Sequence, residues 1–290
     1  MDDALNYTAD SADFKDRVIF ITGATRGIGR AVACDLVRSG ATVILHGRNA
    51  KSLDTLYREL AELGPEPAVA QLDLEKAQGD EYQQLTTEIE DRYGRLDGLL
   101  HNAGILGDRS PIEHYDIGLW QRVLHINLTA PFILTRCFLP LLKESPDASL
   151  LFTTSGVGNQ GRAYWGAYAV SKFGTEGLAQ TLAAELEGTH IRCNLINPGG
   201  TRTNMRRHAY PGEDPDKLPA AEDITGPYLY LLGAASNGVS GARIDAQALS
   251  IRVAARIKAQ TANADEAALK LLEKRAQPLS IGSCITPANT

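Results

Sequence analysis

Residues 18–30 read VIFITGATRGIGR, in which an apolar run passes directly into a glycine-rich turn. Continuous apolar runs of this kind are typical of strands in a parallel sheet that is covered on both faces. Gly23, Gly27 and Gly29 allow the backbone to turn tightly and to approach a pyrophosphate, which would lie at the N-terminus of the following helix. The stretch therefore predicts a dinucleotide-binding turn between a first strand and a first helix.

The same alternation of apolar runs and helical patterns continues along the chain. Strands are predicted at Arg17–Thr22, Thr42–Gly47, Ala68–Leu72, Gly98–His101, Ser149–Thr154, Ile191–Ile196 and Ala242–Ala246. Helices are predicted at residues 28–39, 50–63, 81–93, 116–143, 166–187 and 222–235. Strands that alternate with helices in this way indicate the α/β class. We expect a single Rossmann-type, doubly wound, seven-stranded parallel sheet with helices on both faces.

The length of 290 residues suits one large α/β domain. We expect a polar N-terminal arm at residues 1–16, one NAD(P)-binding domain at 17–249, and a C-terminal extension at 250–290 that is partly helical or mobile. Residues 201–220 are rich in Arg, Pro, Asp and Gly and are predicted to form a long loop. Long loops within compact domains are usually functional or mobile.

The composition argues against several classes of protein. Lys and Arg number 29 and Asp and Glu number 35, so the formal net charge is −6 and nucleic acid is not an expected partner. No run approaches the ~20 apolar residues of a membrane-spanning helix, and no signal-peptide pattern is present. The cysteines lack paired or ligand-like spacing, so we expect reduced thiols, a cytoplasmic protein and no metal site. These cysteines are Cys34, Cys137, Cys193 and Cys284.

The choice of dinucleotide depends on the end of the second predicted strand. Residues 45–49 read LHGRN, with no acidic residue to accept the hydroxyls of an adenosine ribose. Arg48 instead offers a planar guanidinium to a ribose phosphate, and Arg26 in the glycine turn offers a second cation. We therefore expect the cofactor to be NADP(H).

A candidate catalytic pair lies on the predicted helix at residues 166–187. Tyr168 and Lys172 are four residues apart and therefore share one helix face, and Ser155 closes a strand thirteen residues before Tyr168. A free tyrosine, with a pKa near 10, is a poor base at neutral pH. We expect the Lys172 cation, helped by the charge of an oxidised nicotinamide, to lower the pKa of Tyr168 by ~3 units, or roughly 4 kcal/mol. Tyr168 is the expected general acid/base, and Ser155 the expected hydrogen-bond donor to the substrate oxygen.

These motifs together resemble the short-chain dehydrogenase/reductase family over roughly residues 14–246. The TGxxxGxG spacing from Thr22 is similar to that of the short, single-domain branch of the family. The resemblance implies that Asp73 holds the adenine amino group, that residues 102–104 line the cofactor cleft, and that residues 197–203 engage the nicotinamide. It also implies that Lys172 grips the nicotinamide ribose and that Asn127 holds a water in a proton relay.

The expected site thus has a catalytic set and a cofactor-binding set. The catalytic set is Asn127, Ser155, Tyr168 and Lys172. The cofactor-binding set is Gly23, Thr25, Arg26, Gly27, Ile28, Gly29, Arg48, Asp73, Leu74, Asn102, Ala103, Gly104, Tyr168, Lys172, Pro198, Gly199, Thr201 and Thr203, with Ile196 as a further candidate. Within the family, residues 99–108, 160–168 and 197–203 look like the YciK-like group of bacterial oxidoreductases.

The expected function is hydride transfer between NADP(H) and a small-molecule carbonyl or alcohol substrate. A non-catalytic NADP(H)-binding sensor or scaffold is an alternative, although such proteins often lack the Tyr or the Lys that this chain has. A 3-oxoacyl thioester reductase is a second alternative, and its local support is a basic cluster. That cluster is Arg162, Arg202, Arg206, Arg207 and His208.

Two further features are left open by the sequence. Tyr164 and Trp165 either form an aromatic wall for a substrate or pack beneath the 201–220 loop. The resemblance implies a homodimer or homotetramer that pairs the helices at 116–143 and 166–187. The apolar stripe on the helix at 116–143 fits either such an interface or packing in the core.

Overall fold

The computed structural model describes residues 13–247, and all structural statements below concern this part of the chain. The expected extension at 250–290 and most of the expected N-terminal arm lie outside it. The strands are β1 Val18–Ile21, β2 Thr42–Gly47, β3 Ala68–Gln71, β4 Gly98–His101, β5 Ala148–Thr153, β6 Ile191–Asn197 and β7 Arg243–Asp245. The helices are α1 Gly27–Arg38, α2 Ala50–Ala61, α3 Gly79–Tyr93, α4 Ile117–Leu124, α5 Ala130–Lys143, α6 Gly166–Glu185, α7 Asn204–Ala209 and α8 Thr225–Leu232.

All seven strands form one parallel sheet in the order β3-β2-β1-β4-β5-β6-β7. The order reverses at β1, where Phe20 pairs with Ile44 on one side and with Leu99 on the other. A crevice opens beyond the carboxyl ends of the strands at such a reversal, and ligands of open α/β sheets bind there. The predicted Rossmann-type fold is confirmed.

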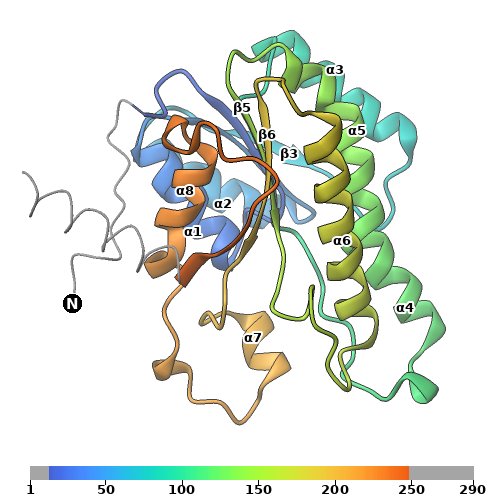
Figure 1. Cartoon of the computed structure of the whole chain (residues 1–290). Coiled ribbons are helices and arrows are strands. Elements are labelled where there is room, and N and C mark those ends of the chain that lie inside the picture. Colours follow the sequence, from blue (N-terminus) through green and yellow to red (C-terminus); the bar gives the residue numbers. More distant parts are fainter. Residues whose placement is uncertain (1–12, 248–290) are drawn as a thin grey trace, which may run out of the picture.

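Helices cover both faces of the sheet, as Figure 1 shows, with α1, α2 and α8 on one face and α3, α5 and α6 on the other. Aromatic side chains fill each layer. Phe20 meets Phe138 of α5 edge to face, with ring centroids 4.9 Å apart, while Tyr228 of α8 is fully buried in the opposite layer. Burying one large apolar side chain stabilises a fold by ~1.5–3 kcal/mol, so these layers hold the sheet rigidly beneath its functional edge.

The chain enters the core before the first strand. Phe14 is fully buried beside Gly233, which follows α8, although residues 1–16 are expected to be a polar arm. Phe14, between Asp13 and Lys15, ties the end of the arm to the α8 layer.

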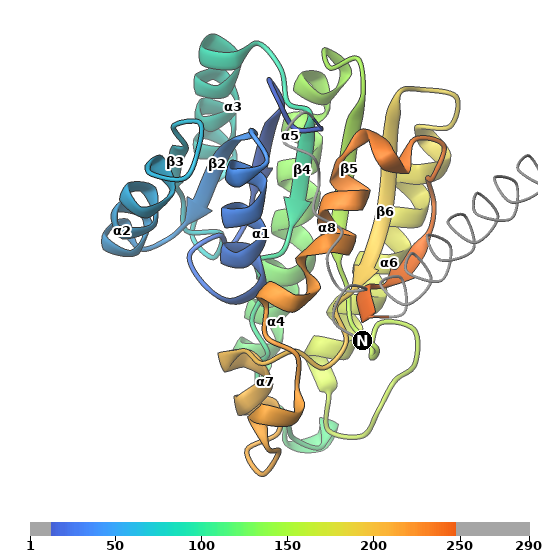
Figure 2. The same cartoon turned by 90° about the vertical axis from the view of Figure 1, so that its left-hand side faces the viewer.

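Two segments differ from the predicted elements. The predicted helix at 116–143 is interrupted by a π-helical turn, His125–Thr129, which joins α4 to α5. The predicted loop at 201–220 contains α7, which begins because the Thr203 side chain accepts a hydrogen bond from the Arg206 amide at 3.2 Å. Figure 2 shows α7 beyond the carboxyl edge of the sheet.

By length and composition alone, one helical stretch among the described residues could cross a membrane, namely Ile117–Lys143. The apolar runs in the sequence do not predict this stretch. The core helix of a globular protein passes the same test, so this is weak evidence for a span. Leu134, Phe138 and Leu142 of this stretch are buried in the core layer, which explains why the helix is apolar.

Candidate active site

A pocket of about 790 Å³ lies along the carboxyl edge of the sheet. The turns that follow β1 to β6, the start of α6 and the segment around α7 all contribute to it. The expected site residues that line it are Gly23, Thr25, Arg26, Gly27, Ile28, Arg48, Asp73, Leu74, Asn102, Ala103, Gly104, Ser155, Tyr168, Lys172, Pro198, Gly199, Thr201 and Thr203. Gly29, Asn127 and Ile196 are not among the residues lining the pocket.

The glycine turn brings the start of α1 to the pocket. A Cβ atom at Gly29 would lie 2.4 Å from the Gly23 carbonyl oxygen, so only glycine allows α1 to start this close to the turn. Arg26 at the N-cap makes no side-chain capping bond, and the first turn has no acidic residue. The first N–H groups of a helix lack intrahelical partners and attract anions. The start of α1 is therefore suited to a pyrophosphate.

Thr22 fixes the turn after β4 against the glycine turn. Its buried hydroxyl oxygen accepts hydrogen bonds from the Asn102 amide at 2.9 Å and from the Ala103 amide at 3.0 Å. The Asn102 side chain donates back to the Thr22 carbonyl at 3.4 Å. One side chain thus sets the distance between two walls of the pocket.

The two arginines expected to select the dinucleotide are both exposed at the pocket. In the described part of the chain, neither Arg26 nor Arg48 forms an ion pair with a carboxylate. Their guanidinium groups are therefore available to a phosphate.

His46 also lines the pocket, although the sequence analysis did not select it. Its Nδ1 accepts a hydrogen bond from the Gly23 amide at 3.4 Å. Burial lowers the pKa of His46 to about 4, so the ring is neutral and can accept this bond. Its position near the carboxyl end of the second predicted strand could have identified it as a pocket residue.

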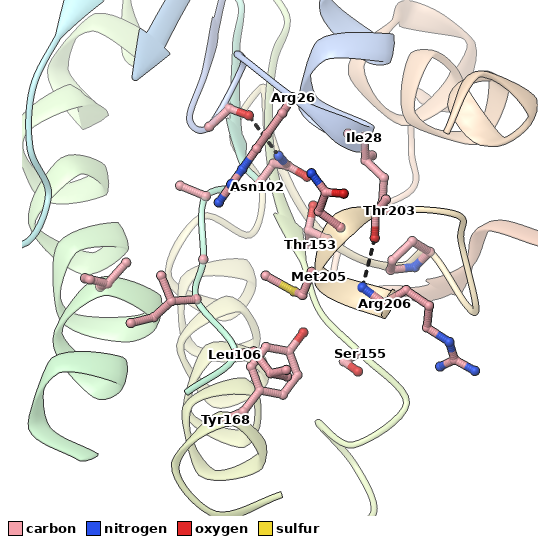
Figure 3. A pocket seen from close by; sticks show the side chains of 18 of the residues that line it. Arg26, Ile28, Asn102, Leu106, Thr153, Ser155, Tyr168, Thr203, Met205 and Arg206 are labelled. Atoms are coloured by element: carbon pink, nitrogen blue, oxygen red, sulfur yellow. Dashed lines mark hydrogen bonds between the residues drawn. The ribbon is translucent and has the colours of Figure 1, made fainter. Parts of the chain in front are cut away.

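Tyr168 and Ser155 meet at the far end of the pocket (Figure 3). Burial raises the pKa of Tyr168 to about 12, while a hydrogen bond with the Ser155 side chain opposes the shift. For the protein's own groups this pKa is therefore raised and not lowered, because burial dominates. The lowering expected from Lys172 together with an oxidised nicotinamide stays a prediction. The phenol is therefore a proton donor over the neutral range.

Lys172 is buried one helical turn after Tyr168. Its Nζ donates a hydrogen bond to the Thr153 carbonyl at 2.8 Å and lies 5.7 Å from the centre of the Tyr168 ring. Burial lowers the pKa of Lys172 to about 8, while the Glu176 carboxylate opposes the shift. The carbonyl of β5 thus aims the ammonium at the catalytic end of the pocket.

Asn127 lies in the π-helical turn and is buried. Its amide oxygen accepts from the Ile105 amide at 2.9 Å, and its amide nitrogen donates to the Ile105 carbonyl at 2.9 Å and to Ser171 Oγ at 3.0 Å. The side chain therefore clamps the turn after β4 to α6. These bonds use both amide protons and one of the two acceptor positions of the amide oxygen, and the expected water-holding role stays a prediction.

The wall beyond Tyr168 is apolar. Leu106, Met205, Ala209 and Trp165 line it, and the Trp165 ring lies 5.7 Å from that of Tyr168. Tyr164 is 55% exposed and is not among the lining residues, so one of the two candidate aromatic residues contributes to the wall.

The segment around α7 is fastened over this wall by cation–π contacts. The Arg109 guanidinium stacks 4.8 Å from the Trp165 ring centre and 5.0 Å from that of Tyr210, and it donates to the Ala209 carbonyl. Trp165 therefore both lines the pocket and packs beneath the segment, and its role as a wall for a substrate stays a prediction.

Most of the basic cluster near the pocket is already bonded. Arg206 forms a bidentate pair with Glu213, and Arg202 pairs with Asp216. Arg207 and His208 both bond to Asn204. Carboxylates therefore balance Arg202 and Arg206, while Arg162 and Arg207 form no ion pair in the described part of the chain but are not among the residues that line the pocket.

Ile196 is fully buried in the α1–α8 layer, so the structure does not bring its side chain to the pocket. Lining residues that the sequence analysis did not select include Ile105, Leu106, Thr153, Met205 and Ala209. Ile105 and Leu106 follow the 102–104 turn directly, which was a usable signal. Met205 and Ala209 reach the pocket through the fold of α7, which no local motif indicates.

Comparisons with known proteins agree with this geometry. The sequence profile of the family described as short chain dehydrogenase matches residues 17–214. The uncharacterized oxidoreductase YciK of Escherichia coli (strain K12) is 48% identical over 244 residues, which cover 84% of this chain and 96% of that protein.

Solved structures show the same similarity. A short chain dehydrogenase from Pseudomonas syringae is 51% identical, with a TM-score of 0.81 over 83% of this chain and 98% of that chain. A short chain dehydrogenase from Escherichia coli CFT073, solved in complex with NADPH, is 48% identical, with a TM-score of 0.80 over 82% of this chain and 99% of that chain.

Proposed function

Because this chain belongs to the short-chain dehydrogenase/reductase family of oxidoreductases, we propose that it is an NADP(H)-dependent enzyme that interconverts a carbonyl and an alcohol. The observation that carries the proposal is that one pocket contains both the expected cofactor-binding residues and the expected catalytic residues. Its one end holds the glycine turn with Arg26 and Arg48, and its other end holds Tyr168 and Ser155. A dinucleotide bound along this pocket would have its phosphates near the glycine turn and the arginines, and its nicotinamide near Tyr168 and Ser155.

The residues present fit NADP(H). The N-terminus of α1 has no side-chain cap and no acidic residue, so its free amides suit the pyrophosphate. Arg26 and Arg48 suit the additional ribose phosphate. The homologous structure from E. coli CFT073 with NADPH supports the same cofactor for this chain. When bound, NADPH supplies the hydride.

Tyr168 performs the proton transfer in the proposed reaction. A carbonyl carbon that receives the hydride leaves the electron pair of its π bond on oxygen. That oxygen takes the Tyr168 proton and becomes a hydroxyl, and the tyrosinate then regains a proton from solvent. Ser155 donates a hydrogen bond to the same oxygen as negative charge develops on it. The buried Lys172 cation stabilises the tyrosinate.

The walls around Tyr168 favour a carbonyl with an apolar or aromatic neighbouring group. Leu106, Met205 and Trp165 surround this end, and Arg206 is paired with Glu213. Arg206 is the arginine of the basic cluster that lines the pocket, and its pairing argues against recognition of a 3-oxoacyl thioester carrier there. The full catalytic set likewise favours an enzyme over a sensor.

The cofactor assignment is tested by thermal unfolding in the presence of NADPH or NADH. A ligand at 100 times its Kd adds roughly 2.7 kcal/mol, a shift of several degrees. We expect stabilisation by NADPH and a smaller effect of NADH. Equal or larger stabilisation by NADH would refute the assignment to Arg26 and Arg48.

The catalytic assignment is tested by NADPH oxidation with ketone probes, among them benzil, an aromatic diketone. Tyr168→Phe should abolish turnover while NADPH binding is retained. A sensor would give no turnover in either protein and equal binding in both.

Two further proposals concern the setting of the enzyme. Cys34, Cys137 and Cys193 are free thiols, which supports a reducing cytoplasm. Phe132 of α5 and Phe173 of α6 are 48% and 45% exposed, which supports association of these helices in a homodimer or homotetramer.

A further inference from the structure

A buried ion pair lies directly behind the catalytic residues. Glu176 of α6 is buried and accepts hydrogen bonds from Thr154 Oγ1 at 2.7 Å and from Arg243 Nε at 2.9 Å. Arg243 belongs to β7, at the edge of the sheet. The pair therefore joins α6, the end of β5 and β7 at one point, and neither charged residue lines the pocket.

Arg243 continues the contact to the main chain of Ser155. Its Nη2 donates to the Ser155 carbonyl at 3.1 Å, and the Gly158 amide donates to the same oxygen at 2.9 Å. A Cβ at Gly158 would lie 2.7 Å from Glu176 Oε1, so this turn rests directly on the carboxylate. The position of Ser155 is thus set from behind by both members of the pair.

Glu176 is also the carboxylate closest in sequence to Lys172, one helical turn away on the same side of α6. The other charged or titratable groups around Lys172 are Tyr168 on the same helix, His101 of β4 and Arg243 beyond Glu176. Tyr228 of α8 interacts with Tyr168. Glu176 is the one anion among them, because burial keeps His101 and both tyrosines neutral at neutral pH.

We infer that Glu176 and Arg243 are positioning residues, which hold the Ser155 main chain in place and balance the charge of Lys172. The inference rests on the proposed function, since it assigns these two residues to the same reaction. The carboxylate stabilises the Lys172 ammonium in a buried position, where an unpaired cation is costly. The guanidinium has three partners: Nε donates to Glu176, Nη2 to the Ser155 carbonyl, and Nη1 to the exposed Asp245 carboxylate of β7 at 3.4 Å. The first two contacts carry the proposed roles.

The charge role is tested without any substrate, by following the titration of Lys172 in the full-length protein labelled with ¹³C at the lysine ε carbons. The Lys172 signal is assigned by its loss in Lys172→Met. Glu176→Gln should lower the titration midpoint of Lys172 by about one pH unit, because it removes the neighbouring anion. Arg243→Gln should move the midpoint upward, because it removes a neighbouring cation and leaves the anion.

The positioning role is tested by the pH dependence of kcat and KM with NADPH and benzil. Glu176→Gln should move the alkaline limb of kcat to lower pH by the same amount as the midpoint. Arg243→Lys keeps a cation beside Glu176 but lacks the second nitrogen for Ser155. It should leave the titration midpoint of Lys172 unchanged and lower kcat about tenfold, with KM within about twofold.

Surface variants with matched charge changes serve as controls. Asp54 and Arg58 form an exposed pair on α2, and Asp54→Asn and Arg58→Gln should leave the lysine midpoint and kcat unchanged. Equal midpoints in Glu176→Gln and Asp54→Asn would overturn the charge role. An unchanged kcat in Arg243→Lys would overturn the positioning role. If the wild-type protein does not turn over any ketone probe, the proposed function fails, while the lysine titration still decides the charge role of Glu176.

Discussion

Replacing Thr22 by valine tests how the two walls of the pocket are held together. The substitution keeps the shape of the buried side chain and removes its hydroxyl. In the native protein this hydroxyl accepts from the amides of Asn102 and Ala103 at 2.9 and 3.0 Å. Both amide donors would lose this acceptor in Thr22→Val.

The expected loss of stability follows from those two amides. A buried donor left without a partner costs about 1–3 kcal/mol. Asn102 and Ala103 are only partly buried, so we take about 1 kcal/mol for each, or about 2 kcal/mol in total. For a domain of this size, 2 kcal/mol corresponds to a fall in Tm of about 4–8 °C.

Urea unfolding measures the free energy, and NADPH titration measures the effect on the pocket. We expect about 2 kcal/mol of destabilisation together with an NADPH affinity about tenfold weaker, because residues 102–104 line the pocket. Thr22→Ser is the matched control. It keeps the acceptor, loses about 1 kcal/mol for the buried methyl group, and should retain NADPH affinity. A Thr22→Val protein within about 0.5 kcal/mol of wild type, with unchanged NADPH affinity, would refute this account.

Three other predictions use separate measurements. Arg26→Ala and Arg48→Ala should each weaken NADPH binding about tenfold in calorimetry and leave NADH binding nearly unchanged; equal losses for both cofactors would contradict the phosphate assignment. Burial lowers the pKa of His46 to about 4 and that of His101 to about 3, from 6.5, so the unfolded chain binds more protons below pH 6.5. Stability should therefore fall as pH drops from 6.5 towards 4, and His101→Gln should flatten this dependence in urea unfolding at several pH values. Phe173→Asp should shift the protein to a smaller species in light scattering, and an unchanged mass would exclude this face from the subunit interface.

Much of the fold could be predicted because the relevant signals are local. Apolar runs and the glycine turn mark β1, β2 and the start of α1 without any knowledge of distant contacts. The same holds for the expected site residues that follow the strands, since parallel strands bring their carboxyl ends to one edge. Residues 102–104 lie at the pocket for this reason.

The remaining features depend on contacts between distant parts of the chain. Glu176 and Arg243 are 67 positions apart, and nothing in the local sequence of either pairs it with the other. The pKa of Tyr168 likewise could not be predicted from the local sequence. The i, i+4 spacing predicts a nearby cation, but it does not reveal how far burial raises the pKa of the phenol. Burial is a property of the packed molecule.

The π-helical turn at His125–Thr129 constrains how this chain can change in length. A π turn is one extra residue accommodated in an α-helix, and each residue rotates the helix by about 100°. The extra residue lets Asn127 face the pocket-side turn while Leu134 and Phe138, farther along, face the core. Deleting one residue here would rotate one of those faces away from its partners. We therefore expect insertions and deletions to be tolerated in the exposed loops at the opposite edge of the sheet and to be excluded from this helix.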